Sequence, residues 1–144
     1  MVSSHIKTIA LASLILVQAV PSMAQTPTAS GIRELGQRLE TARDVSERKR
    51  AAQGLGRAST PMSVALLRRA RTSEREVQVR LEIVRALRTI AFQRYPGYRD
   101  ALRGIAEAAD DDFERDALVR LRATEALWEA GKKDFARGMI RTWV

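Results

Sequence analysis

The residues best suited to chemistry are acidic and lie close together in the C-terminal third of the sequence. Asp110, Asp111 and Asp112 run in succession, and Glu114 and Asp116 follow them. Carboxylates at this density can bind a divalent cation or act as a general acid and base. The spacing lacks the bidentate glutamate of an EF-hand loop, whereas aspartate at a helix start caps free amides and offsets the helix dipole. We therefore interpret residues 110–112 as a helix cap and predict no metal site. A carboxylate enzyme built on Asp111, Asp112 and Glu114 is the alternative.

Other kinds of catalytic site are excluded by the residues that the chain lacks. It contains no cysteine, and its one histidine, His5, falls in a segment that we predict to be removed. Zinc sites made of Cys and His, Ser-His-Asp and Cys-His nucleophiles and thiol redox chemistry all need these residues. We predict a protein with no catalytic residues, no cofactor and no enzyme activity.

The N-terminal segment has the pattern of an export signal. Lys7 is the only charged residue before an apolar run at residues 9–20, which Pro21 ends, and Ser22-Met23-Ala24 offers small residues at a cleavage site. The run is shorter than the roughly 20 residues that cross a bilayer. We predict a cleavable signal peptide at residues 1–24, a short polar leader at 25–30 and a folded domain at 31–144. The mature protein would lie in the periplasm or be secreted, without integral membrane insertion.

The rest of the sequence reads as a row of helices. Apolar residues recur at intervals of three and four, good helix formers dominate, and strand patterns are almost absent. We expect Gly56 and Gly131 to end two of the helices. The predicted helices lie at residues 30–43, 46–55, 60–71, 72–92, 99–109, 110–130 and 132–143, with a turn at 95–98.

An internal repeat organises these helices. Three segments align without a gap: Arg48-Lys-Arg-Ala-Ala-Gln-Gly-Leu55, Arg80-Leu-Glu-Ile-Val-Arg-Ala-Leu87 and Arg120-Leu-Arg-Ala-Thr-Glu-Ala-Leu127. Each aligned segment follows a shorter helix, and self-similarity of this kind is typical of stacked repeats.

The repeats resemble a known family. Val79-Arg80 and Val119-Arg120, each followed by Ala-Leu, are similar to the second helix of HEAT repeats, and Gly54-Leu55-Gly56 resembles the ending of bilin-lyase-type HEAT-like repeats. The resemblance covers about residues 31–143. It implies an all-α fold, a short right-handed α-solenoid of about three stacked helical hairpins that serves as a binding scaffold. It carries no bilin chemistry onto this chain. Glu47, where valine is usual, marks the first repeat as a terminal cap.

A helical wheel places one polar strip on the second helix of each repeat. In a stack, these strips lie side by side and form a concave surface. The positive charge of the chain is spread over the helices and interleaved with acids, so we expect a protein or extended-peptide partner and no nucleic acid. The predicted partner-binding groove consists of Arg50, Gln53, Arg57, Gln78, Glu82, Arg85, Arg122, Glu125 and Glu129.

Three arginines fall instead on the apolar side of these helices. A buried guanidinium needs carboxylate and carbonyl partners, because an unpaired buried charge costs several kcal/mol. Acids stand six residues before two of the arginines. We predict a structural ladder between repeats that consists of Arg48, Arg80, Arg120, Glu74 and Glu114.

Two further surfaces remain as alternatives to the groove. Tyr95 and Tyr98 flank Pro96-Gly97 and either recognise a partner or pack over helix ends. Phe135, Met139 and Trp143 share one face of the last helix, which either caps the stack or docks a second chain. Self-association through this helix, up to an end-to-end stack of copies, is therefore a third hypothesis beside the scaffold and the enzyme.

Overall fold

A computed structural model describes residues 27–93 and 97–142, and the regular structure within these residues is entirely helical. This confirms the predicted all-α class. Four of the described helices follow a residue whose side chain caps them, such as Asp44 before the second helix or Thr60 before the third. The helices are α1 (Ala29–Thr41), α2 (Val45–Ala58), α3 (Pro61–Ser73), α4 (Val77–Gln93), α5 (Tyr98–Ala109), α6 (Ala117–Glu129) and α7 (Lys133–Thr142).

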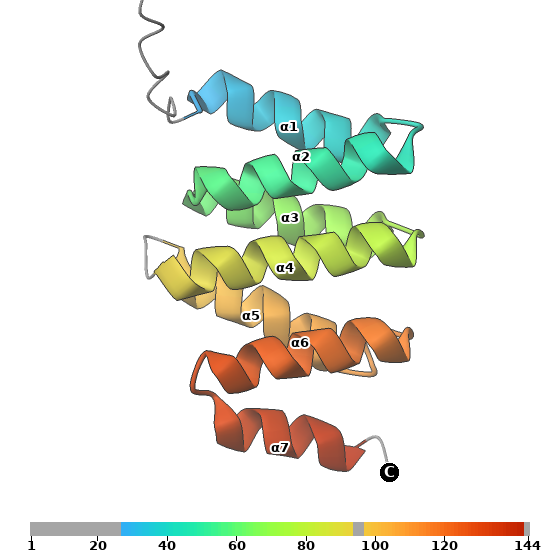
Figure 1. The fold of residues 1–144 in the computed structure, drawn as a ribbon, viewed down its shortest axis with the longest axis vertical. Coiled ribbons are helices and arrows are strands. Elements are labelled where there is room, and N and C mark those ends of the chain that lie inside the picture. Colours follow the sequence, from blue (N-terminus) through green and yellow to red (C-terminus); the bar gives the residue numbers. More distant parts are fainter. Residues whose placement is uncertain (1–26, 94–96, 143–144) are drawn as a thin grey trace, which may run out of the picture.

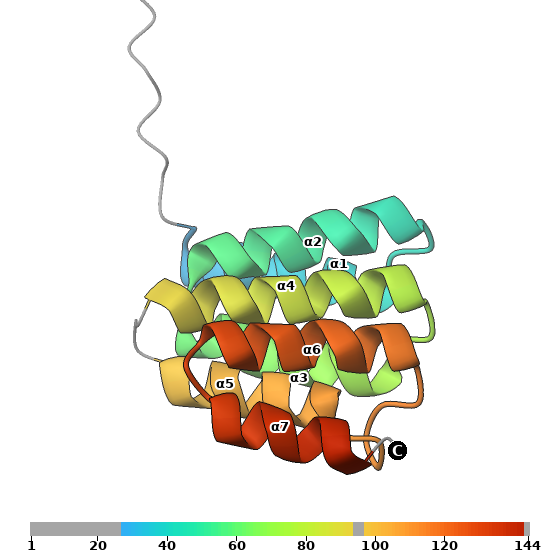
Figure 2. The ribbon, with the colours of Figure 1, turned by 60° about the horizontal axis from the view of Figure 1, so that its bottom comes forward.

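The helices form a short α-solenoid, as predicted. Three hairpins, α1–α2, α3–α4 and α5–α6, stack one on the next, and α7 packs on α6 after them (Figure 1). The first helices of the hairpins, α1, α3 and α5, contact one another in one layer, and α2, α4 and α6 contact one another in a second layer. Figure 2 shows α2, α4 and α6 side by side across this second layer.

A continuous apolar core between the two layers holds the stack together. Leu55, Leu87 and Leu127 occupy the same position in the three aligned segments, and all three are buried. Val64 and Leu67 of α3 and Ile105 of α5 fill the layer opposite. Burying a leucine side chain contributes about 1.5–3 kcal/mol, so the repeated apolar positions supply most of the packing between hairpins.

Several predicted helix boundaries are wrong, and each error has a local cause. Gly56 lies inside α2, and Ser59 adopts the left-handed conformation after its end, with φ of 50°. Thr72 belongs to the last turn of α3 instead of opening α4, because its hydroxyl bonds back to the carbonyl of Arg69. α1 begins at Ala29, capped by Thr28, so the predicted leader at 25–30 overlaps the first helix.

The acidic segment also differs from the prediction. Residues 110–112 do not cap α6; Asp110 accepts a bond from the amide of Asp112 and closes a turn. Asp116 caps α6 by accepting from the amides of Leu118 and Val119. The helix therefore starts several residues later than predicted, because the acid nearest the apolar run takes the cap.

Some predictions fall outside the described residues, namely the signal peptide, Tyr95 and Trp143. Tyr98 is described: it is the first residue of α5, half-buried and packed against the core. Among the helices of residues 27–93 and 97–142, none is long and apolar enough to span a membrane.

Candidate binding surface

The outer face of α2, α4 and α6 carries two hollows, and eight of the nine predicted groove residues line them. The smaller hollow, of about 270 Å³, lies between α2 and α4 and includes Gln53, Arg57, Glu82 and Arg85. The larger, of about 550 Å³, lies between α4 and α6. We call it the α4–α6 groove; its lining is Gln78, Leu81, Val84, Arg85, Arg88, Leu118, Arg122, Glu125, Ala126 and Glu129.

Arg50 is the predicted residue that the structure separates from the others. It is exposed on α2 but borders a different hollow, between α1 and α2, together with Leu35, Arg38 and Glu47. The polar strip of α2 therefore turns away from the α4–α6 groove at its N-terminal end.

The difference in width between the two hollows follows from one repeat position. A Cβ atom on Gly56 of α2 would lie 3.0 Å from both Cα and Cβ of Ala86 on α4, so these helices touch through their backbones. The aligned repeats place Arg88 at the position of Gly56, and Ala126 of α6 lies opposite it across the groove. Because the Arg88 side chain occupies this position, α4 and α6 pack less extensively than α2 and α4.

Ion pairs neutralise the charges that line the α4–α6 groove. Arg88 lies 2.6 Å from a carboxylate oxygen of Glu129 on the opposite wall, and its guanidinium also stacks over the ring of Phe92, 5.4 Å from the centroid. Arg122 and Glu125 pair along α6 at 2.8 Å. Both groove glutamates on α6, Glu125 and Glu129, therefore have a cationic partner.

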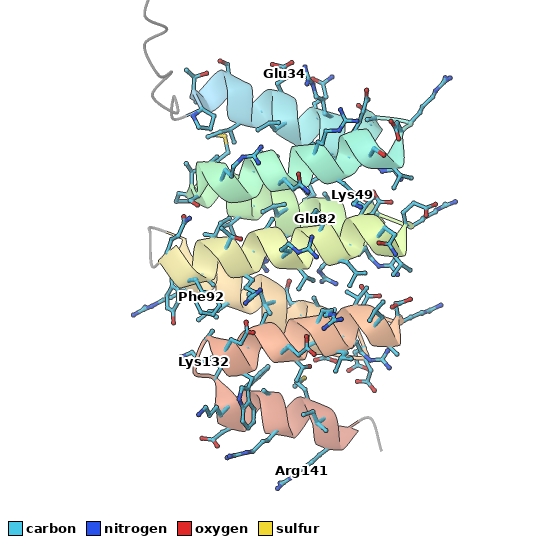
Figure 3. The ribbon with its side chains drawn as sticks, in the orientation of Figure 1. Glu34, Lys49, Glu82, Phe92, Lys132 and Arg141 are labelled. Atoms are coloured by element: carbon cyan, nitrogen blue, oxygen red, sulfur yellow. The ribbon has the colours of Figure 1, made fainter. Side chains whose placement is uncertain are left out.

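Glu82 is buried, contrary to the expectation of a solvent-facing strip. It is 4% exposed, and the guanidinium of Arg85 covers it, with Nη1 donating to Oε2 at 2.8 Å. The wheel placed Glu82 on the polar strip of α4, but the close contact between α2 and α4 removes this position from solvent. The Glu82 label in Figure 3 lies in this narrow interval between the two helices.

Arg50 and Arg57 differ from the other arginines of this face. Both are exposed, and neither has an ion pair or side-chain hydrogen bond with any residue in the described part of the chain. The positive charge that remains on the face is thus concentrated on α2.

The ladder residues pair forward, from one repeat to the next. Arg48 of α2 donates from Nε and Nη2 to both carboxylate oxygens of Glu74, at 2.8 and 3.3 Å, and Nε of Arg80 lies 3.1 Å from Glu114. The carboxylate of Glu74 therefore pairs with Arg48 and not with Arg80, six residues after it. Side chains in both pairs are 15% exposed or less, so solvent screens these ion pairs only weakly.

Each ladder arginine also closes its own loop. Nη1 of Arg80 donates to the carbonyls of Glu74 and Arg75, at 3.0 and 2.8 Å. Arg48 and Arg120 make the corresponding bonds to the two carbonyls six and five residues before them. These bonds satisfy carbonyl groups at the turn between the helices of each hairpin, which would otherwise cost free energy when buried.

Arg71 is a buried cation that the sequence did not single out. It is 4% exposed on α3, and its nearest carboxylate oxygens, on Glu107 and Glu114, are 3.9 and 4.0 Å away. Burial lowers the pKa of the Arg71 guanidinium, against the opposing attraction of the two glutamates. Glu107 is closer to Arg68, at 2.6 Å. The aligned repeats could have located Arg71, since it is the core-facing position that Leu39 fills in α1.

The structure does not bring the acidic candidates Asp111, Asp112 and Glu114 together at one point. Oxygen atoms of Asp110, Asp111 and Asp112 lie within 4.8 Å of one another, with Asp111 and Asp112 exposed. Glu114 is 4% exposed and turns inward onto Arg80. Glu114 therefore faces the ladder, while Asp111 and Asp112 face solvent, and the three carboxylates do not line one enclosed pocket.

A family model described as HEAT repeats matches residues 32–128. This match covers more than half of the chain, and the chain belongs to the HEAT-repeat family. Comparison with curated proteins gives no match, and comparison with solved structures gives none either. HEAT repeats commonly serve as scaffolds for protein interactions.

Proposed function

We propose that this protein is a non-catalytic scaffold of the cell envelope that binds a protein or an extended peptide on the face formed by α2, α4 and α6. The observation that carries the proposal is the α4–α6 groove, an open hollow of about 550 Å³ with charged walls. Its walls are helices that a continuous core holds in place, so the groove is formed before a partner arrives.

The composition of the groove suits recognition better than catalysis. Leu81 and Leu118 offer apolar contact, while the arginines and glutamates around them offer directional hydrogen bonds. The charged groups pair with one another at 2.6 and 2.8 Å, so they orient a ligand and leave no free acid–base pair in this groove.

The place of action and the subtype of repeat rest on the sequence. The apolar run at residues 9–20 and the small residues before Gln25 support export to the periplasm or beyond. Gly54-Leu55-Gly56 supports a bilin-lyase-type HEAT-like repeat, and the chain has no cysteine for bilin attachment. We propose that the chain shares the repeat architecture of this subtype and not its bilin chemistry.

The test uses the absence of cysteine from the chain. A single cysteine in the α4–α6 groove, Gln78→Cys, accepts a photoreactive maleimide, and Gln37→Cys on α1 provides a matched exposed glutamine away from the groove. Periplasmic extract of the source cells is irradiated with each labelled protein. We expect a discrete adduct from the Gln78 position and none from the Gln37 position.

Adducts of equal intensity from both positions would overturn the proposal, because they would show that the groove is not preferred over the opposite layer. An adduct from Gln37 alone would move the binding surface to the layer of α1, α3 and α5.

A further inference from the structure

We propose that the partner segment is an acidic peptide that places one apolar side chain in the α4–α6 groove and a carboxylate on Arg57. This inference rests on the proposed function and specifies the chemistry of its ligand.

The arginines of this face differ in whether a glutamate pairs with them. Within the α4–α6 groove, Arg85, Arg88 and Arg122 are each paired with a glutamate at 2.6 or 2.8 Å. On α2, Arg57 and Arg50 have no such partner in the described chain. A ligand therefore meets a nearly neutral groove beside a cationic helix, and complementarity requires negative charge on one side of its apolar anchor.

Arg57 lies at a hollow where a carboxylate can reach it from solvent. It borders the shallow hollow between α2 and α4 together with Gln53, whose amide can donate a hydrogen bond, and Thr89, whose hydroxyl already donates to the carbonyl of Arg85. Because Gly56 and Ala86 bring the two helices into backbone contact, the floor of this hollow lies close under the surface. A carboxylate can thus receive a charge-assisted bond from Arg57 without being buried deeply.

Two leucines of the α4–α6 groove, Leu81 and Leu118, can contact an apolar side chain of the peptide. Leu118 is 43% exposed at the edge of the α4–α6 groove, and Leu81 lies half-buried in its wall. An aliphatic side chain that covers both would gain about 25 cal/mol for each Å² of apolar surface removed from water.

The distance from Arg57 to the leucines of the α4–α6 groove determines how far apart the carboxylate and the apolar side chain stand in the peptide. Neighbouring packed helices lie about 8–10 Å apart, and an extended chain advances about 3.3 Å per residue. In the repeat alignment Arg57 corresponds to Thr89 of α4 and Glu129 of α6, so it lies eight positions beyond Leu81 and eleven beyond Leu118 along the helix direction. That offset is about 12–17 Å at 1.5 Å per residue. A carboxylate on Arg57 therefore belongs roughly six residues from the anchor in the groove, on a peptide that crosses diagonally over α4.

The experiment measures fluorescence polarisation of the full mature chain with three labelled synthetic peptides. They share the frame Gly-Ser-Leu-Ser-Ser-Ser-Ser-Ser-Xaa-Xaa-Ser-Gly, in which Xaa is Glu, Gln or Lys. We expect the glutamate peptide to bind tightest and its affinity to fall as the salt concentration rises, because exposed charges are screened.

Two variants with matched controls test the two contacts separately. Arg50→Glu with Arg57→Glu should weaken the glutamate peptide about tenfold or more at low salt and less at high salt. Arg33→Glu with Arg99→Glu makes the same charge change at exposed arginines of α1 and α5 and should have a much smaller effect. Leu118→Ser should weaken all peptides that bind, whereas Leu121→Ser, equally exposed on α6 but outside the groove lining, should not.

The inference is overturned if the glutamine or lysine peptide binds as tightly as the glutamate peptide, or if none of the three binds. It is equally overturned if a single-stranded oligonucleotide competes as well as the glutamate peptide, since that would indicate a general polyanion site. Adducts formed through Gln78→Cys would still support a partner in the groove in each of these cases, so the two proposals can fail separately.

Discussion

At the scale of single residues, the ladder arginines perform two tasks with different nitrogen atoms. In Arg48 and Arg80, Nε faces the carboxylate of the following repeat, while Nη1 holds two carbonyls of the preceding loop. One guanidinium thus joins the turn of its own hairpin to the next hairpin. The planar fork of arginine suits this role, whereas lysine would supply a single point of charge.

Replacement of Arg80 by alanine should lower the free energy of unfolding by about 3–5 kcal/mol, because it leaves the buried carboxylate of Glu114 without its nearest cation. Urea denaturation followed by circular dichroism measures this loss. Arg122→Ala is the matched control, since Arg122 and Glu125 are both exposed, and it should cost under about 0.5 kcal/mol. Equal losses for the two variants would contradict the role of the ladder.

Arg85 is exposed but is not a neutral site. The side chain of its partner Glu82 is buried, so Arg85→Ala should cost about 1–3 kcal/mol by leaving a buried carboxylate without its donor. The double variant Arg85→Ala with Glu82→Gln should recover part of that loss in the same urea titration. A loss below about 0.5 kcal/mol for Arg85→Ala would show that Glu82 reaches solvent.

Replacement of Arg71 should raise the free energy of unfolding, in contrast to replacement of Arg80 or Arg85. Its charge is buried, and no carboxylate lies closer than 3.9 Å, while Glu107 and Glu114 have nearer partners in Arg68 and Arg80. Arg71→Met keeps the aliphatic volume and removes the desolvation cost, so it should raise the free energy of unfolding by about 1 kcal/mol. A decrease of more than about 2 kcal/mol, measured by thermal and urea denaturation, would show that the guanidinium is satisfied.

At the scale of helices, the repeat determines far more than the local propensity does. The apolar positions and the aligned segments predicted the number of hairpins and their order, because burial repeats with the fold. Helix ends depend on which of several nearby polar residues takes the cap, and neighbouring acids such as Asp110 and Asp116 both accept backbone amides within a few residues. The periodicity of apolar residues does not predict which of these acids caps the helix.

The candidate surface could be predicted in outline but not in depth. A single-helix wheel gives the direction of a side chain, and it located Arg57, Gln78 and Glu125 on the face that carries the two hollows. The depth of each position depends on the distance between adjacent helices, which a wheel does not give. The close contact of α2 and α4 buries Glu82, and the looser packing of α4 and α6 leaves the groove open at Arg88. The signal for the groove was present in the repeat alignment, where Gly56 and Arg88 share a position.

Helical glycines offer a direct test of these distances. Gly56→Ala should destabilise the protein by about 1–3 kcal/mol, because the new Cβ lies 3.0 Å from the Ala86 backbone. Gly138→Ala on α7 meets no atom within 4 Å and should stabilise by about 0.5–1 kcal/mol through the helix propensity of alanine. Melting temperatures of the two variants should therefore shift in opposite directions. A shift of the same sign in both would contradict the close contact of α2 and α4.

At the scale of the whole molecule, the two ends of the stack differ (Figure 3). The first repeat has Ala42 where the later repeats carry Glu74 and Glu114, so it offers no carboxylate to a ladder arginine of another copy. On α7, Phe135 is 46% exposed beside a hollow of about 230 Å³. Association through α7 can therefore produce a closed dimer, whereas open head-to-tail stacking lacks the ladder.

Sedimentation equilibrium of the mature protein should accordingly show no species larger than a dimer as concentration rises. If a dimer forms, Phe135→Ser should weaken it, because Phe135 is among the exposed apolar residues of α7. Continuous growth into longer polymers would contradict this expectation.

Export can be checked on the whole protein as well. The polar N-terminus, the apolar run and the small residues at 22–24 predict that the mature chain begins at Gln25. Mass spectrometry of the N-terminal peptide from the periplasmic fraction measures this position. Recovery of an intact Met1 from that fraction would contradict cleavage.

The forward direction of the ladder has a consequence for how such a protein can change in length. The segment from residue 74 to residue 113 begins with a carboxylate that accepts from the repeat before it and contains Arg80, which reaches the repeat after it. A tandem duplication of this segment would give Arg48 its Glu74, the first Arg80 the second Glu74, and the second Arg80 Glu114. Gene duplication can thus lengthen this binding surface by whole units, and no duplication step strands a buried charge.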